Sequence, residues 1–145
     1  MIPGIESLSG PPAYLALAAL AAMPLAEVYV VAPLGVGLGL DPFAVGVATF
    51  TGKLAPVYAI HLADRRYGLA GPAWATSRAE GVWRRHGVPG LSLAAPGLGV
   101  YACVSVAVAL DAPRRSLLAW TTASLALWTA GVTVLSAAGY DLVTA

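Results

Sequence analysis

Charged side chains are scarce in this sequence. Asp, Glu, Lys and Arg together make up only 10% of its 145 residues, whereas a soluble domain carries about 25%. Hydrophobic residues make up 59% of the chain, and the mean hydropathy is +0.78. Such a chain has too few polar side chains to cover a surface that faces water. The composition therefore predicts an integral membrane protein.

The chain also has only one cysteine, a net charge close to zero and no serine–histidine pair suited to catalysis. Cys103 is the single cysteine, so the chain has no intrachain disulfide and no cysteine cluster that would hold a metal. The formal net charge is only +1, without the strongly basic balance that attracts nucleic acid. Ser92 and Ser105 lack the nearby histidine that an intramembrane serine protease needs. We therefore expect no enzyme, no cofactor, no metal site and no nucleic-acid partner.

Apolar segments of helical length are abundant instead. About 20 helical residues cross a hydrocarbon core that is about 30 Å thick. The four apolar segments span residues 14–40, 43–63, 88–110 and 117–138. We expect an all-α fold in which the second and fourth segments are long helices. Pro24 and Pro33 are expected to break the first segment, and Pro96 and Gly97 the third.

The longest polar stretch, residues 64–87, separates the two pairs of segments and holds five of the seven arginines. Positive charge marks the cytoplasmic side of a membrane protein, so we place this linker in the cytoplasm. Trp74 and Trp83 suit an amphipathic segment at the membrane interface. The localisation that follows is a cell membrane crossed more than once.

Arg114 and Arg115, between the third and fourth segments, discriminate between two topologies. If all four segments crossed the membrane, these arginines would lie outside, against the positive-inside rule. If the third segment is a re-entrant hairpin, they lie in the cytoplasm. By symmetry the first segment is then re-entrant from the outside. We therefore predict one membrane domain, residues 1–145, of two inverted repeats at about 12–63 and 88–138, each a proline-broken re-entrant hairpin plus a transmembrane helix.

A short echo in the sequence supports the duplication. Leu38-Gly39-Leu40-Asp41-Pro42 is followed later by Val108-Ala109-Leu110-Asp111-Ala112-Pro113. In both places an Asp and a Pro precede a long apolar segment. Asp is a favoured N-cap and Pro suits the first helical turn, so we interpret Asp41 and Asp111 as helix caps.

Glu27 and Lys53 are the charged residues that lie well inside apolar segments. An ionisable residue at membrane depth is costly and usually functional. Glu27 is expected to be a coupling carboxylate that exchanges protons, or else an acid that caps the helix opened by Pro24. Lys53 is expected to pair with Glu27 or to bind a lipid phosphate. Snorkelling to the surface is the remaining alternative, but a residue near the middle of a helix is about 15 Å from either interface.

Smaller polar residues carry weaker signals. Hydroxyl side chains in the second and fourth segments would line a polar path or, more simply, form hydrogen bonds between helices. These are Thr49, Thr51, Thr121, Thr122 and Ser124. His61 and Asp64 stand about one turn apart, but two ligands are too few for a metal site, so an interfacial polar cluster is expected.

Three motifs together resemble those of a known family. Residues 23–35, Met-Pro-Leu-Ala-Glu-Val-Tyr-Val-Val-Ala-Pro-Leu-Gly, are similar to the signature of the prokaryotic small multidrug export proteins. Gly52-Lys53-Leu54-Ala55-Pro56 resembles the Gly-Asn-x-x-Pro of that family's next helix, with Lys53 in the place of the asparagine. Ala95-Pro96-Gly97-Leu98-Gly99-Val100-Tyr101 is similar to its second proline-glycine break. The order and spacing agree from about residue 14 to residue 138. Where many members have Glu-x-Arg, Tyr29 replaces the arginine.

The resemblance implies a small transporter, a multidrug exporter coupled to an ion or to protons. The family is distantly similar to DedA-type membrane proteins, which have paired re-entrant hairpins. The alternative is a lipid-handling protein of the scramblase or flippase kind, or a membrane protein that transports nothing. The expected partners are the lipid bilayer, a small amphipathic substrate or lipid, and further copies of the same chain.

Overall fold

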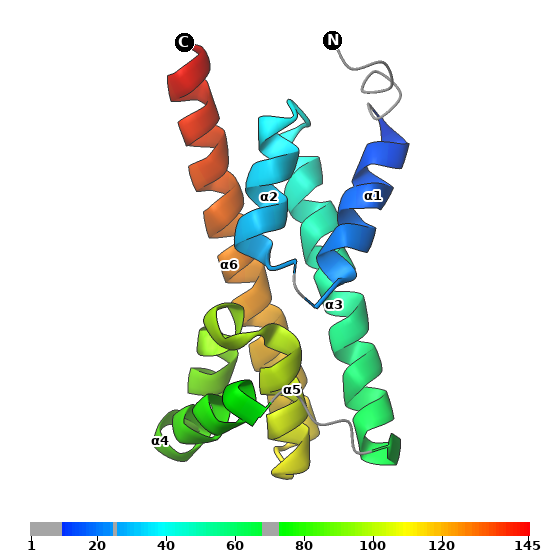
Figure 1. Ribbon diagram of the computed structural model, residues 1–145, viewed down its shortest axis with the longest axis vertical. Coiled ribbons are helices and arrows are strands. Elements are labelled where there is room, and N and C mark those ends of the chain that lie inside the picture. Colours follow the sequence, from blue (N-terminus) through cyan, green and yellow to red (C-terminus); the bar gives the residue numbers. More distant parts are fainter. Residues whose placement is uncertain (1–9, 25, 68–72) are drawn as a thin grey trace. The chain divides into compact units, whose positions relative to one another are not determined.

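The computed structural model of the chain describes residues 10–24, 26–67 and 73–145, and for residues 63–67 and 73–76 only the backbone (Figure 1). The described residues form helices and no strand. The helices are α1 (Pro11–Ala22), α2 (Val28–Gly37), α3 (Pro42–Tyr67), α4 (Ala73–Leu98), α5 (Val100–Ala109) and α6 (Arg114–Thr144). The all-helical class predicted from the sequence is confirmed.

Helices α3 and α6 are the longest apolar elements. The spans Pro42–Leu62 and Arg114–Thr144 are long and apolar enough to cross a membrane. Only a third of the most apolar window in each is buried within the chain (33% for both). Many outward side chains are therefore large and apolar, as Phe43 in α3 and Leu135 in α6 illustrate. The prediction of two long apolar helices is confirmed, and α6 runs several residues beyond the predicted end at residue 138.

The first apolar segment breaks only once. Helix α1 ends at Ala22 and α2 begins at Val28, so Pro24 lies in the break. Pro33 was predicted as a second break, but it lies inside α2, as the sixth residue of that helix. A proline there forfeits one backbone hydrogen bond, to the carbonyl of Tyr29, and the flanking turns continue the helix.

The third segment breaks two residues after the predicted site. Pro96 and Gly97 belong to the last turn of α4, and the chain leaves helical geometry at Gly99, whose φ is 94°. A residue with a side chain rarely adopts this left-handed conformation, which explains a glycine at the turn. The predicted linker is also largely helical, because α4 begins at Ala73 and bends at Gly87, where φ is 63° and ψ is −154°. Residues 68–72 of that linker lie outside the described residues.

The ends of α2 and α5 have the same hydrogen-bond pattern. The Leu40 N–H donates to the Gly35 carbonyl and the Gly39 N–H to the Val36 carbonyl. At the end of α5 the Ala112 N–H donates to the Ala107 carbonyl and the Asp111 N–H to the Val108 carbonyl. Both are Schellman motifs, with Gly39 (φ 78°) and Asp111 (φ 56°) as the left-handed residues.

This match fixes a register of 72 residues between the two halves of the chain. Helices α2 and α5 begin at Val28 and Val100 and end at Gly37 and Ala109, and α3 and α6 begin at Pro42 and Arg114. The echo noted in the sequence had aligned Asp41 with Asp111, a register of 70. In the structural register Asp111 corresponds to Gly39 instead, because it ends α5 and does not begin α6.

The described chain divides into two compact units that share the long helices. Unit 1 comprises Met1–Lys53 and Thr129–Ala145, and unit 2 comprises Leu54–Trp128. In unit 1, α1 and α2 form a helical hairpin whose core also includes Val45 of α3 (Figure 1). Each unit thus contains one broken hairpin, part of α3 and part of α6.

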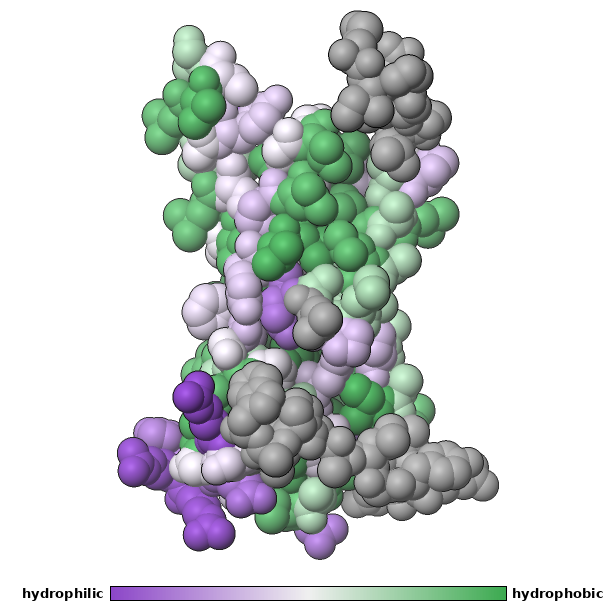
Figure 2. All heavy atoms as spheres, viewed as in Figure 1, coloured by the Kyte–Doolittle hydropathy of each residue, from purple (hydrophilic) through white to green (hydrophobic). Residues whose placement is uncertain are grey.

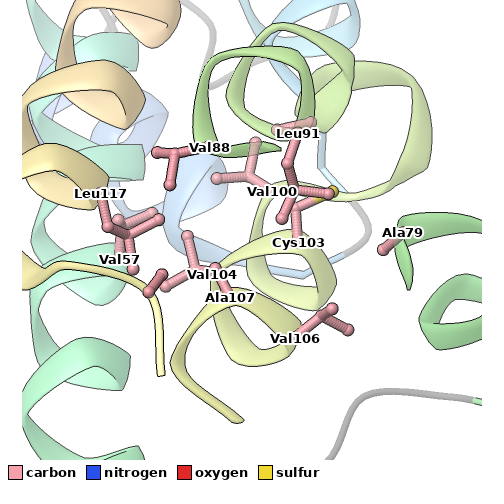
Figure 3. Close-up of a cluster of buried hydrophobic side chains, with 12 residues drawn as sticks. Val57, Ala79, Val88, Leu91, Val100, Cys103, Val104, Val106, Ala107 and Leu117 are labelled. Atoms are coloured by element: carbon pink, nitrogen blue, oxygen red, sulfur yellow. The ribbon is translucent and has the colours of Figure 1, made fainter. Parts of the chain in front are cut away.

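The core of unit 2 gathers around α5. Val100, Cys103, Val104 and Ala107 of this helix point into a cluster that also takes in Leu91 and further residues of α3, α4 and α6 (Figure 3). Hydrophilic residues gather over the first part of α4, whereas hydrophobic residues cover α2 in unit 1 (Figure 2). The polar surface of the described chain is therefore unevenly distributed, as the sequence predicts for the arginine-rich linker.

Candidate functional site

The break between α1 and α2 exposes backbone carbonyls inside unit 1. Met23 (φ −70°, ψ 141°) ends α1 and Glu27 (φ −76°, ψ 160°) precedes α2, and both are extended. Pro24 promotes the break because it cannot continue the hydrogen-bond pattern of α1. In an apolar environment, backbone oxygens at such a break require donors from elsewhere.

Lys53 of α3 supplies those donors. Its side chain is completely buried (0% exposed). The Lys53 Nζ donates to the Ala26 carbonyl at 3.0 Å and to the Met23 carbonyl at 3.3 Å. It also lies 3.5 Å from Glu27 Oε1, with which it forms an ion pair. The ammonium therefore donates to two backbone carbonyls of the broken segment and forms an ion pair with the carboxylate of the same segment.

The neighbouring glycine explains how Lys53 comes so close to the break. A Cβ atom at Gly52 would lie 2.7 Å from the Ala18 carbonyl carbon and Cα, and closer still to the Ala18 oxygen. Only glycine lets α1 approach α3 to this distance. The sequence motif Gly52-Lys53 thus combines a close helix contact with a charge placed beside it.

Glu27 faces Lys53 and does not cap α2 with its side chain. The residue is 7% exposed and occupies the N-cap position of α2. Its carbonyl accepts hydrogen bonds from the Val30 and Val31 N–H groups, at 2.9 and 3.1 Å. Its carboxylate makes no capping hydrogen bond. Of the alternatives weighed for Glu27 and Lys53, the geometry brings the two charges together.

The charge pair has no counterpart in unit 2. In the register of 72 residues, Glu27 corresponds to Gly99 and Lys53 to Leu125, which is 2% exposed. In unit 2 a hydroxyl group donates to the backbone inside α4, since Ser124 of α6 donates at 2.7 Å to the Ser92 carbonyl, to which Pro96 has no N–H to donate. The site is thus a feature of one half of the chain.

Most of the other predicted polar residues form contacts between or within helices. Thr122 lies 3.1 Å from the Tyr58 hydroxyl, and Thr121 lies 3.4 Å from Ser92 Oγ. Thr51 donates to the Val47 carbonyl of its own helix at 2.8 Å. These geometries favour hydrogen bonding within and between helices over a polar path. Thr49 is the exception, because its hydroxyl is buried without a partner among the described residues.

The two predicted caps differ. Asp41 Oδ1 accepts a hydrogen bond from the Ala44 N–H at 2.8 Å, which is N-cap geometry at the start of α3. Asp111 ends α5 and lies three residues before α6, so it does not cap that helix. His61 is buried (2% exposed), and the side chain of Asp64 lies outside the described residues. No metal-binding cluster of three or more His, Cys, Asp or Glu residues occurs within the described part of the chain.

Comparison of the chain with protein-family models, with curated proteins and with solved structures gave no match. The arguments about function therefore rest on the charge pair, the broken hairpins and the two long apolar helices.

Proposed function

We propose that the protein is a multi-pass membrane protein in which α3 and α6 cross the bilayer. The hairpins α1–α2 and α4–α5 are re-entrant in this proposal, and the two halves are inverted repeats. The supporting observations are the apolar outward surfaces of the long helices and the shared register of 72 residues. The arginines of residues 64–87, with Arg114 and Arg115, support a cytoplasmic location for these two segments in the proposal, because positive charge is retained on that side of a membrane.

Within this fold we propose a small secondary transporter, an exporter of amphipathic cations similar to the small multidrug export proteins. The observation that carries the proposal is the buried Lys53–Glu27 pair. Lys53 lies in α3, a helix of membrane-spanning length, and Glu27 lies in the break between α1 and α2. Intramembrane ionisable residues are expensive and mark transport paths. Broken helices near the membrane midplane are where secondary transporters bind substrates and ions.

The geometry supports a simple exchange at Glu27. Because Lys53 also donates to the Met23 and Ala26 carbonyls, it stays in place when the Glu27 carboxylate is neutralised. The carboxylate can therefore pair in turn with the Lys53 ammonium, a proton or a cationic substrate. A proton and a cationic substrate cannot bind the Glu27 carboxylate at the same time, and this competition is the requirement for proton-coupled export.

The test is substrate-dependent proton flux in proteoliposomes that enclose a pH-sensitive dye, with tetraphenylphosphonium as the amphipathic cation. The wild-type protein should release protons when the cation gradient is applied, and Glu27→Gln should abolish this release. The matched control is Glu80→Gln, the same substitution at a partly exposed acid of α4, which should leave the flux unchanged. Equal flux in wild type and Glu27→Gln would contradict the coupling role.

The principal rival is a lipid-handling protein with the same fold. Accelerated movement of fluorescent phospholipid between leaflets, without any cation-dependent proton release, would favour that function.

We also propose a homo-oligomer, because two long helices per chain are too few to enclose a transport path. The exposed apolar side chains of α3 and α6 offer the surfaces for such contacts.

A further inference from the structure

Three buried threonine hydroxyls in unit 1 play no part in the pair described above. Thr49 of α3 and Thr129 and Thr133 of α6 are 0%, 3% and 6% exposed. None of the three hydroxyl oxygens has a hydrogen-bond partner among the described residues. A buried hydroxyl without a partner lowers stability because it has lost its hydrogen bonds to water, so three in one unit call for an explanation.

The contacts between α3 and α6 place these hydroxyls together. A Cβ atom at Gly46 would lie 3.4 Å from Thr133 Oγ1, and one at Gly39 would lie 3.9 Å from the Tyr140 hydroxyl oxygen. Gly39 precedes the start of α3 by three residues, so within unit 1 the first part of α3 runs antiparallel to the last part of α6, with position 46 level with 133 and position 39 level with 140. Continuing this register brings Thr49 level with about position 130, next to Thr129. Lys53 follows Thr49 by four residues, so it lies one turn further along the same face.

On α6 the hydroxyl residues form a row that leads outward. Thr129, Thr133, Ser136 and Tyr140 are spaced by four, three and four residues, which places them on one face of the helix. Exposure increases along the row, from 3% at Thr129 to 39% at Tyr140. The row covers 12 residues, and its ends are about 16 Å apart along the helix. This length is about half of a hydrocarbon core about 30 Å thick.

The spacing suits bound water. Successive hydroxyls on the row are separated by about 4.5–6 Å along the helix. One water molecule with two hydrogen bonds of about 2.8 Å bridges that distance. Thr133 packs closely against Gly46, since a Cβ atom there would lie 3.4 Å from the Thr133 hydroxyl oxygen, so any side chain at position 46 would crowd that hydroxyl. A buried water needs two to four polar partners, which the threonines supply.

We propose that this row binds a chain of water molecules and conducts protons between the Glu27–Lys53 pair and the end of α6 near Tyr140. The inference rests on the proposed membrane function, in which this end faces outward and Glu27 takes up external protons. In unit 2 the hydroxyls of Ser92, Thr121 and Ser124 bond to one another or to the backbone. In unit 1 the Ser136 hydroxyl donates to the Val132 carbonyl at 2.7 Å and keeps its lone pairs for water, whereas Thr49, Thr129 and Thr133 have no partner among the described residues. The water row is therefore assigned to unit 1.

The test compares neighbouring positions at the same depth on α6. In a Cys103→Ser background, the variants Thr133→Cys and Ser136→Cys lie on the row, whereas Val134→Cys and Leu135→Cys lie on the outward face, where the native side chains are 66% and 74% exposed. A charged methanethiosulfonate reagent reacts with the thiolate, which forms where water is present. In proteoliposomes we expect positions 133 and 136 to react at least about tenfold faster than 134 and 135.

Each outcome has a distinct meaning. If all four positions fail to react, the row is dry and the inference is wrong, whereas the membrane location of α6 stands. If positions 134 and 135 react as fast as 133 and 136 or faster, α6 lies in water and the proposed membrane function itself is wrong. Position 136 keeps the test decisive if Thr133→Cys does not fold.

Gly46→Ala offers a second measurement in the same system. Its methyl group would lie 3.4 Å from Thr133 Oγ1, a tight contact that leaves less space for water. We expect labelling at position 136 to continue and labelling at position 133 to slow several-fold. The matched control is Gly37→Ala, where an added Cβ would meet nothing within 4 Å. An unchanged rate at position 133 in Gly46→Ala would contradict the placement of water beside that residue.

Discussion

At the scale of single residues, Lys53 does more than neutralise an acid. Besides its ion pair with the Glu27 carboxylate, it donates hydrogen bonds to two backbone carbonyls of the α1–α2 break. Loss of the ammonium would therefore leave both a buried carboxylate and two carbonyls without their donor. Loss of the carboxylate would leave a lysine that still has two acceptors. Substitution of Lys53 should therefore destabilise the protein more than substitution of Glu27.

A double-mutant cycle measures this inequality. We expect Lys53→Met to lower the free energy of unfolding by about 3–5 kcal/mol, because it leaves an unpaired buried charge. Glu27→Gln should cost less, and the double variant should be more stable than Lys53→Met alone. Unfolding in mild detergent, followed by circular dichroism, gives the three values. Additive losses would show that the two side chains act independently in solution.

The sequence predicted the pair but not how it is supported. Glu27 and Lys53 lie in apolar segments and have opposite charges, which indicates that they form an ion pair, since an isolated buried charge is strongly destabilising. The Met23 and Ala26 carbonyls were missed because backbone acceptors carry no signal in the sequence. The row containing Thr129 and Thr133 was missed for a different reason. Isolated threonines in an apolar helix are common, and only their burial without partners makes these two unusual.

At the scale of helices, the contact between α1 and α3 depends on Gly52. Gly52→Ala would place a methyl group against the Ala18 backbone, which a rigid helix cannot move away from without separating from α3. We expect a loss of about 1–3 kcal/mol or more in unfolding free energy. Gly37→Ala is the control, and it should be neutral or slightly stabilising. Equal thermal midpoints for the two variants would mean that the helices are not in close contact at Gly52.

The two aspartates that precede the long helices should respond oppositely to substitution. Asp41→Ala removes the hydrogen bond to the Ala44 N–H and should cost about 0.5–2 kcal/mol. Asp111→Gly should maintain or raise stability, because glycine adopts the left-handed conformation found there without strain. Thermal unfolding of both variants checks this contrast. A large loss for Asp111→Gly would instead indicate a role for its carboxylate.

The helix breaks show where local sequence signals mislead. Pro33, Pro96 and Gly97 were all predicted as breaks, and all three lie within helices. A proline removes one hydrogen bond, which the rest of a well-packed helix can tolerate. The actual break before α5 occurs at Gly99, because a left-handed residue ends a helix more completely than a missing donor does. Packing decides between a bend and a break, and it is not visible in the local sequence.

At the scale of the whole molecule, labelling from outside the cell tests the proposed topology. In a Cys103→Ser background, Asp41→Cys should react with an impermeant maleimide, and Arg78→Cys and Arg114→Cys should react only after permeabilisation. The reason is that arginines are retained on the cytoplasmic side. Outside labelling at position 114 would mean that the third apolar segment crosses the membrane completely. That result would exclude the inverted repeat but would leave the Glu27–Lys53 contact unaffected.

The division of the long helices between units bears on how such a chain arose. Unit 1 is completed by the last part of α6, and unit 2 by the last part of α3, so each half of the sequence contributes to the unit built on the other half. An ancestral protein of one half would have lacked a helical segment that its own fold needs. Two copies lying side by side would have exchanged those segments. Under the proposed duplication, fusion of two ancestral genes would have made permanent an arrangement that earlier required two separate molecules to meet, and one copy would then have been free to acquire a lysine and a glutamate at positions where the other has leucine and glycine.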